Sequence, residues 1–438
     1  MTQSATITGP LGADLGKGQS ARIAGASMVG TTLEWYDFTV YNTMAALAFN
    51  RLFFPSVDPL AGVILAFSTY AVGYLSRPLG GVVFGRLGDR LGRRAVLVLT
   101  LVLMGLTTAG MGLLPTYETV GVAAPILLVA LRFVQGVALG GEWAGAVLLS
   151  MEHGRQDRRG LNASWTQMGP AMGIILATTA IALLTTTLSD AQFIAWGWRT
   201  PFVASLALVV FGLWIRRGVE ESPMFEALEA GHQKAEAPVG EVLTHHWRRL
   251  LIAGACRVGT DVHYTLPAVF SLTYITTVLK LPSTTGLVAV LAGAVVNAVC
   301  VPLCGLLSDR FGRRPVYGLG VLGSALWAFP FFALLDTKST SLIVLAIVVG
   351  YACHAAMYGP QGAFITEQFP TPVRYTGSSL AYTFAGVVGG GFAPLIIAAL
   401  FQYYGSTAAV SVYVLAALLV TTASLVAARE TAGKPLEA

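Results

Sequence analysis

The stretch GRLGDRLGRRAVL at residues 85–97 returns as GLLSDRFGRRPVY at residues 305–317, and this repeat decides the fold. Eight of the thirteen positions are identical, at an offset of 220 residues. A glutamate followed seven positions later by an arginine also occurs twice at a similar offset. These pairs are Glu152 with Arg159 and Glu367 with Arg374. The chain is therefore predicted to consist of two related halves.

The composition is that of a membrane protein. Of the 438 residues, 55% are hydrophobic and 11% are charged, whereas an average soluble domain is roughly 25% charged. Residues 95–111 and 406–428 contain no charged side chain, and each stretch is close to the ~20 apolar residues that cross a bilayer. The net charge of +5 comes without a basic patch interleaved with aromatic residues, so we expect no nucleic-acid partner.

The hydrophobic segments predict an all-α membrane protein with twelve transmembrane helices in two six-helix halves. The predicted spans are 22–48, 61–86, 95–115, 122–150, 160–187, 199–217, 248–278, 284–308, 315–335, 340–367, 374–401 and 406–428. We expect an N-terminal tail over 1–21, a first half over 22–217, a linker over 218–247, a second half over 248–428 and a C-terminal tail over 429–438. Internal repeats of this size are typical of secondary transporters.

The distribution of Lys and Arg predicts the orientation. With both termini inside, the cytoplasmic segments hold 20 of the 27 Lys and Arg residues, and the outer loops hold four. Cytoplasmic loops of membrane proteins carry such an excess. The polar start of the chain also differs from a signal peptide. We therefore expect a multi-pass protein with both termini, both tails and the linker in the cytoplasm.

Several motifs resemble those of the major facilitator superfamily. The repeated Gly-x-Leu-x-Asp-Arg-x-Gly-Arg-Arg loop resembles that superfamily's hallmark, and LRFVQGVALGGEW at 131–143 resembles its Arg-centred fourth-helix motif. Further stretches narrow the resemblance to the metabolite:proton symporter family. They are LEWYDF at 33–38, SRPLGG at 76–81, WGWRTPF at 196–202 and EESPMF at 220–225. The resemblance covers nearly the whole chain and implies the major facilitator fold.

This family includes carriers of shikimate, α-ketoglutarate, citrate and proline or betaine. The likeness is greatest to the shikimate carriers, through GGEWAGA at 140–146, Arg257 and RYTG at 374–377. The resemblance implies a proton-coupled symporter that works as a monomer in the bacterial cytoplasmic (inner) membrane, by alternating access. Its partners would be a small-molecule substrate, protons and the lipid bilayer. It would need no cofactor or metal, because the proton gradient drives it.

Charged residues inside membrane spans are costly and mark candidate sites. Glu34, Asp37 and Tyr41 share one face of the first span. The resemblance places the first and fourth spans side by side, so Asp37 and Arg132 are expected to meet near mid-membrane. An anionic substrate at Arg132 would then compete for that cation, and the released carboxylate would take up a proton. A static ion pair that only joins the two spans is the alternative.

Two polar stripes predict the substrate-facing wall of the second half. The seventh span carries Arg257, Asp261 and Tyr264 at helical spacing, and the tenth span carries a second stripe. The second stripe consists of His354, Tyr358 and Gln361. Arg257 would be a second cation for a carboxylate, although a self-satisfied Arg257–Asp261 pair on one helix is an open alternative. His354 is more often a structural residue than a proton carrier.

Other residues complete the predicted site and gate. Trp143 and Gln167 are candidates for substrate contact, and Glu142 is either a second proton site or, preferably, a partner of Arg77. In the superfamily, the Asp of the hallmark loop caps a helix of the other half and pairs with Arg. The resemblance therefore implies a cytoplasmic gate formed by Gly85, Asp89, Arg93, Glu152, Asp309, Arg313 and Glu367.

The substrate class follows from the same side chains. Arg with Tyr and Trp suits a hydroxylated or aromatic carboxylate such as shikimate. Dicarboxylates such as α-ketoglutarate remain open, and so do betaine- or proline-type substrates, because carboxylates lie in the spans as well. Proton-coupled antiport also remains open, because MGPAMG at 168–173 contains the Gly-Pro of some antiporters. No catalytic triad, metal cluster or phosphate loop occurs in the spans, so an enzyme is not expected.

Overall fold

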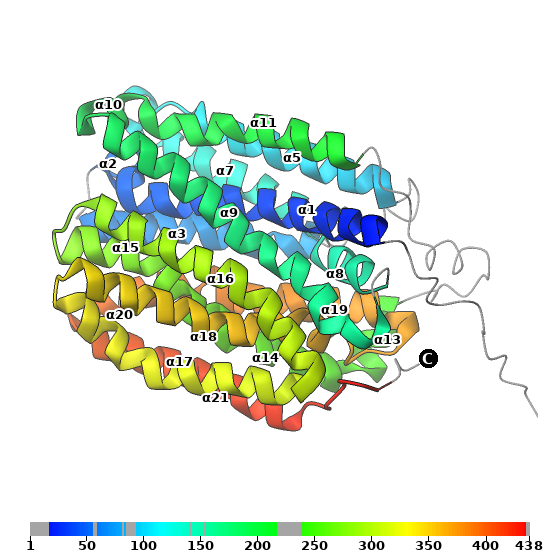
Figure 1. Ribbon diagram of the computed structural model, residues 1–438. Helices are drawn as coiled ribbons and strands as arrows, with labels where there is room; N and C mark the ends of the chain where they lie inside the picture. The colour runs from blue at the N-terminus through cyan, green and yellow to red at the C-terminus, as the bar shows by residue number, and fades with distance from the viewer. Residues whose placement is uncertain are drawn as a thin grey trace, which may run out of the picture.

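The structure of the chain is a computed structural model that describes residues 17–55, 59–80, 83–84, 93–140, 142–152, 155–216 and 238–434. The described residues form six long helical segments in each half, which run roughly side by side (Figure 1). The predicted all-α fold is confirmed. The domain boundaries stay a prediction, because most of the 1–21 tail and of the 218–247 linker lies outside the described residues.

The long segments of the first half fall close to the predicted spans. They are α1 (Lys17–Met44) with η1 (Ala45–Phe49) and α2 (Asn50–Leu52), α3 (Pro59–Leu75), α5 (Arg93–Gly112), α7 (Ala123–Ala138) with α8 (Glu142–Glu152), α9 (Arg159–Thr187) and α11 (Thr200–Arg216). Short helices α6 (Tyr117–Val120) and α10 (Asp190–Ala195) lie in the loops.

The second half repeats this arrangement. Its segments are α14 (Trp247–Thr265) with η4 (Leu266–Phe270), α15 (Ser271–Thr273) and η5 (Tyr274–Val278), α16 (Ser283–Phe311), α17 (Arg313–Asp336), α18 (Thr340–Thr366), α19 (Arg374–Ala385) with η7 (Gly386–Gly391) and α20 (Ala393–Tyr404), and α21 (Thr407–Ala427). The short helix α13 (Pro238–His245) precedes them. The turns η4, η5 and η7 are π-helical, a distortion that is frequent at functional sites.

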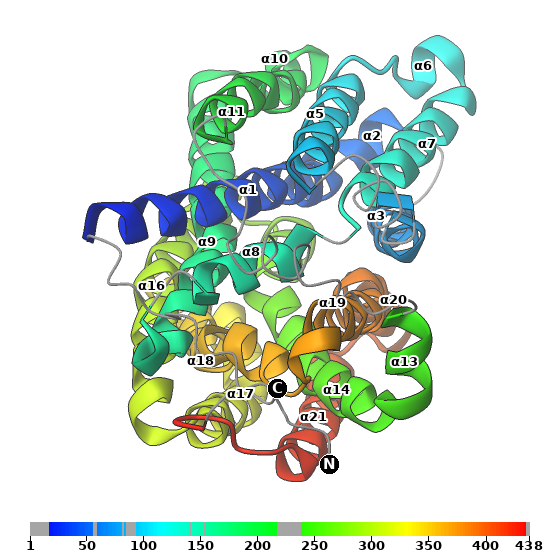
Figure 2. The same cartoon turned by 90° about the vertical axis from the view of Figure 1, so that its right-hand side faces the viewer.

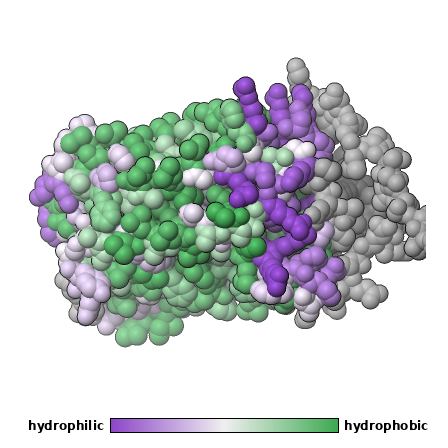
Figure 3. All heavy atoms as spheres, turned by 90° about the horizontal axis from the view of Figure 1, so that it is seen from below, coloured by the Kyte–Doolittle hydropathy of each residue, from purple (hydrophilic) through white to green (hydrophobic). Residues whose placement is uncertain are grey.

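The outer surface matches a lipid environment. Figure 3 shows an apolar band between two polar ends of the molecule. Large side chains such as Leu319 (68% exposed) and Leu326 (70% exposed) point outward from α17. A water-soluble protein would bury most of such a surface. Among the described residues, eight helical segments are long and apolar enough to cross a membrane, so the chain is a multi-pass membrane protein.

The two halves meet along two seams (Figure 2). Helix α9 packs along α16 at one seam, and α3 packs against α20 and η7 at the other. Small residues permit the first contact: a Cβ built on Gly305 would lie 2.6 Å from Ser164 Cβ. Gly, Ala and Ser at such positions let membrane helices approach closely.

One end of the bundle holds both the start of α1 and the end of α21 (Figure 1). We call it the termini end. Helices α8, α13 and α19 lie there too, and the sharpest polar belt of Figure 3 surrounds it. This grouping places the second copy of the repeated motif, at residues 305–317, at the termini end beside the start of α9.

Candidate functional site

A buried ion pair joins the first two spans. Arg77 Nη2 lies 3.1 Å from Glu34 Oε1, and both side chains are almost fully buried. The guanidinium carbon of Arg77 also lies 4.1 Å from the ring centre of Tyr74. Because a buried charge is tolerated only when it is paired, Glu34 explains how Arg77 can lie inside the bundle. Glu142, preferred as the partner of Arg77 from the sequence, has a side chain that lies outside the described residues.

Asp37 and Arg132 belong to one hydrogen-bonded chain. Arg132 is fully buried, and its guanidinium carbon lies 3.4 Å from the ring centre of Tyr41. It donates to Gln135 Oε1, and Gln135 Nε2 donates to Thr108 Oγ1 at 2.6 Å. Thr108 in turn donates to Asp37 Oδ2 at 2.8 Å. The two predicted residues are therefore connected through two intervening side chains.

Gln135 and Thr108 are not singled out by the sequence pattern, although each gives a weak signal. Gln135 follows Arg132 by three positions on α7, so the two side chains face the same side of the helix. Thr108 is one of two adjacent threonines in an apolar span, and a threonine there can satisfy itself by bonding its own helix. Only the packing of α5 between α1 and α7 shows that Thr108 bonds across helices.

The second half holds a comparable cation. Arg257 Nε lies 2.8 Å from Asp261 Oδ2 on the same helix, and both side chains are buried. The guanidinium carbon lies 3.3 Å from the ring centre of Tyr382, and Arg257 also donates to the Tyr382 carbonyl oxygen. The ion pair between Arg257 and Asp261 is therefore present on one helix, and the ring of Tyr382 of α19 lies against Arg257. Tyr382 is not predicted from the sequence.

The two predicted stripes of α14 and α18 meet as an aromatic cluster. The ring centres of Tyr264 and His354 lie 5.0 Å apart, and His354 stacks on Tyr358 at 4.9 Å. His354 Nδ1 is 3.1 Å from Asn297 Nδ2 of α16. Tyr264 also makes an edge contact with Trp35 of α1, at 5.3 Å. Through this contact, the aromatic cluster of α14 and α18 reaches helix α1 of the first half.

A second contact between the halves involves Trp143 of α8. Its ring stacks on Tyr382 with centres 3.6 Å apart and planes 6° from parallel. Trp143 Nε1 donates to Gln167 Oε1 at 2.8 Å, and Gln167 Nε2 donates to the Tyr358 carbonyl oxygen at 3.4 Å. The predicted residues Trp143 and Gln167 thus lie at the junction of the halves, beside the Arg257 stack. Gln361, the third predicted residue of α18, donates to Tyr317 of α17 at 2.7 Å.

Asp309 joins the two halves at the termini end. Its two carboxylate oxygens accept the backbone N–H groups of Gly160 and Leu161, at 2.8 and 2.9 Å. These groups are at the start of α9, where a carboxylate is favoured by unsatisfied donors and the helix dipole. Arg313 Nη1 lies 2.6 Å from the same carboxylate. This is the arrangement that the resemblance implied for this motif.

Glu367 lies at the centre of the contacts made by the predicted gate residues. Its carboxylate lies 3.3 Å from Arg313 Nε and 3.2 Å from Arg159 Nε, and Thr431 Oγ1 donates to it at 2.6 Å. Arg159 belongs to the first half, so this buried carboxylate ties the halves together. Gly85 and Asp89 of the predicted gate lie outside the described residues, as do the side chains of Arg93 and Glu152.

A C-terminal strap, Arg429–Lys434, runs over this gate. Glu430 accepts the N–H groups of Arg313 and Arg314 at 3.0 and 2.9 Å, and so caps α17. Partial burial would raise the pKa of Glu430, but its backbone N–H donors outweigh burial and lower it. A carboxylate with a lowered pKa stabilises the folded state at neutral pH, and this contribution is lost as the pH falls through the lowered pKa. Arg159 Nη2 also donates to the Lys434 carbonyl oxygen at 2.8 Å.

Asp309→Asn is expected to open the gate, because the variant loses the charge that caps α9 and pairs with Arg313. A hydrogen bond to a charged group contributes about 1.5–3 kcal/mol, so the ratio of closed to open molecules should fall by about tenfold or more. Hydrogen exchange at Gly160 and Leu161 should become faster, and transport should slow. Asp157→Asn is the matched control, because Asp157 pairs with Arg155 on the exposed surface. Unchanged exchange in Asp309→Asn would contradict this role.

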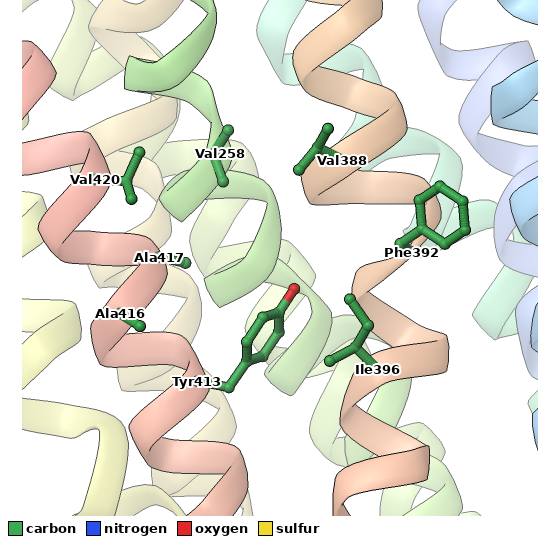
Figure 4. A pocket seen from close by; sticks show the side chains of 8 residues that line it. All are labelled: Val258, Val388, Phe392, Ile396, Tyr413, Ala416, Ala417 and Val420. Atoms are coloured by element: carbon green, nitrogen blue, oxygen red, sulfur yellow. The ribbon is translucent and has the colours of Figure 1, made fainter.

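A separate apolar cavity of about 380 Å³ lies between α14, η7, α20 and α21. Figure 4 shows its lining, in which Tyr413 is surrounded by aliphatic side chains and Phe392. None of the eight described residues that line it is charged. It therefore offers no counter-ion to an organic acid, unlike the junction around Arg257.

Known families match both halves of the chain. A family model described as "Sugar (and other) transporter" matches residues 23–245, and one described as "Major Facilitator Superfamily" matches residues 260–437. The shikimate transporter of Escherichia coli K12 is 41% identical, with 96% of this chain and 97% of that protein covered. The glycine betaine/proline/ectoine/pipecolic acid transporter OusA of Dickeya dadantii is 33% identical, with 94% and 84% covered.

Solved structures share the fold. The xylose transporter XylE of E. coli, in a partially occluded inward-open conformation, matches with a TM-score of 0.77 at 18% identity. The match covers 96% of this chain and 100% of that one. XylE bound to 6-bromo-6-deoxy-D-glucose matches with a TM-score of 0.74, also at 18% identity.

Proposed function

The chain belongs to the major facilitator superfamily of membrane transporters, and on this premise we propose that it imports a small organic acid together with protons by alternating access. The favoured substrate is a shikimate-like, hydroxylated or aromatic carboxylate. The likeness to the E. coli shikimate transporter supports this choice, and so do buried arginines that lie against aromatic rings.

The observation that carries the proposal is the Arg257 stack at the junction of the halves. Arg257 lies against the ring of Tyr382, and Tyr382 stacks on Trp143. The Trp143–Tyr382 pair joins the two halves, because Trp143 belongs to the first half and Tyr382 to the second. A guanidinium binds a carboxylate through parallel N–H groups, while aromatic faces pack against a cyclic substrate. Rearrangement of the Trp143–Tyr382 stack would admit the ring of the substrate and bring its carboxylate to Arg257.

Proton coupling is assigned to the chain of side chains from Arg132 to Asp37. Arg132 keeps its positive charge. Hydrogen bonds through Gln135 and Thr108 link Arg132 to Asp37. A substrate anion that passes Arg132 on its way to Arg257 would neutralise this charge. Asp37 would then take up a proton from water on the side to which the site is open, and release it on the other side with the substrate. The buried hydrogen bond between Thr108 and Asp37 supports this assignment.

Alternating access is assigned to the contacts around Asp309 and Glu367. Rocking of the halves would break the bonds from Gly160, Leu161 and Arg159 and remake them in each cycle. We place the termini end in the cytoplasm of a bacterial inner membrane, as the excess of Lys and Arg supports. The structure then corresponds to a protein whose cytoplasmic end is closed.

Antiport is the second candidate, and its supporting feature has another explanation. The MGPAMG segment contains Gly169 and Gly173, which lie in α9 against α1. A Cβ built on Gly173 would lie 2.6 Å from the Thr32 carbonyl oxygen. Close packing of α1 on α9 therefore accounts for both glycines without an antiport mechanism.

A thermal-stability screen tests the substrate class. Shikimate should raise the unfolding temperature of the purified protein more than α-ketoglutarate or betaine does. A ligand at 100 times its Kd stabilises the folded state by about 2.7 kcal/mol. The methyl ester of shikimate is the control, because it keeps the ring and removes the charge that Arg257 would bind. A larger effect of betaine, or an equal effect of the ester, would contradict the proposal.

A further inference from the structure

A basic pocket lies at the termini end, away from the junction of the halves. Its volume is about 490 Å³, and it lies between α13, the start of α14, the end of α18 and the end of α21. Arg248, Arg249 and Arg429 line it together with His245 and His246. No Asp or Glu is among the described residues of the lining. A concave site with this charge attracts an anion.

Two carboxylates at the termini end are engaged by groups outside this pocket. Glu367 follows α18 and is occupied by Arg159 and Arg313 of the gate. Glu430 accepts backbone N–H groups at the start of α17. The pocket also contains the first residues of α14, whose unsatisfied N–H groups and helix dipole add positive potential. The described lining of the pocket thus carries cationic side chains only.

Exposed apolar side chains lie on the helices that form the pocket, close in sequence to its lining residues. Trp247 is 47% exposed, Leu251 is 61% exposed and Val426 is 68% exposed. Val239 and Leu243 of α13 are exposed too, and α13 lies at the outer edge of the bundle beside α14 (Figure 2). Tryptophan and an amphipathic helix at this level are typical of a membrane interface. The occupant therefore combines an anionic group with acyl chains.

We propose that this basic pocket binds the phosphate of an anionic phospholipid, whose acyl chains lie against Leu251 and Val426. Arg248 and Arg429 are the exposed cations that meet the phosphate. Gln368 donates to the Arg429 carbonyl oxygen at 3.0 Å, and Arg429 is followed by Glu430 of the strap. A bound lipid would therefore hold the C-terminal strap over the gate and slow its opening.

Native mass spectrometry of the purified full chain tests the proposal with phosphatidylglycerol, phosphatidylethanolamine and inorganic phosphate as probes. Phosphatidylglycerol should bind most tightly, and Arg248→Gln should weaken it about fivefold, as expected for one cation near an anionic lipid. Arg310→Gln is the matched control. Arg248 and Arg310 are both exposed cations beside an aromatic neighbour, at 5.4 Å from Trp247 and 5.3 Å from Phe311.

The comparison of the two variants decides the result. Weaker phosphatidylglycerol binding in Arg248→Gln, with unchanged binding in Arg310→Gln, supports the site. An equal effect of both variants would show a diffuse attraction to the basic end and would overturn it. Occupancy by inorganic phosphate that blocks the lipid, or equal binding of phosphatidylethanolamine, would overturn it too. Circular dichroism of both variants confirms that they are folded.

Discussion

Asp37→Asn is expected to abolish proton-driven accumulation of the substrate while exchange of substrate across the membrane continues. Asn has nearly the same volume and can still accept the hydrogen bond from Thr108, but it cannot take up a proton. With one proton per substrate, a gradient of 2 pH units drives about 100-fold accumulation. In proteoliposomes the variant should reach only equilibration, whereas counterflow should remain measurable. Full accumulation by Asp37→Asn would show that another group carries the proton.

The link to Arg132 has its own test. Thr108→Val keeps Asp37 and removes the hydroxyl that connects it to Gln135, so coupling should weaken and accumulation should fall severalfold. Thr107→Val is the matched control on the same helix. Thr107 is buried as well, but its hydroxyl donates to the carbonyl oxygens of Leu103 and Met104 on α5. Equal effects of the two variants would mean that Thr108 acts only through packing.

Arg257→Gln is expected to weaken substrate binding by about 30-fold or more, because removal of one partner of a buried charged contact costs 2–5 kcal/mol. The variant should also unfold more easily, since Asp261 would be left as an unpaired buried charge. Binding is measured by isothermal titration of the purified protein, and unfolding by thermal denaturation.

The double variant Arg257→Gln/Asp261→Asn separates the two roles of Arg257. It removes both charges of the pair, so the unfolding temperature should recover. Substrate binding should stay weak, because the cation for the carboxylate is still missing. If Arg257 only neutralises Asp261, the double variant would recover binding along with stability. Asp261→Asn alone keeps the cation and should bind substrate.

The fold could be predicted from the sequence because its causes are local. Charge-free stretches such as 95–111 and 406–428 are typical of membrane spans, and the repeat at 85–97 and 305–317 indicates two halves. The contacts of Asp309 could be predicted too, because the repeated motif contains both the Asp and the Arg that take part in them. In the sequence, Arg159 stands out only because it follows Glu152 by seven positions, as Arg374 follows Glu367. Its contact with Glu367 depends on how the halves close.

The details of the candidate site depend on packing between helices. The stripe of Arg257, Asp261 and Tyr264 follows from helical spacing, but Tyr382 comes from another helix whose polar side chains give no obvious stripe. The partner of Arg77 shows the same limit. Glu34 lies 43 positions away in the sequence and meets Arg77 only because the first two spans are adjacent. Spacing within one helix cannot select such partners.

The direction of proton movement tests the central claim most directly. Shikimate is added to de-energised proteoliposomes, and the pH of the weakly buffered outer medium is followed. Symport predicts that the medium becomes more alkaline as protons enter with the substrate, and that this signal disappears in Asp37→Asn. Acidification of the medium would indicate antiport, and entry of shikimate without any pH change would indicate uncoupled transport; either result would contradict the proposed mechanism.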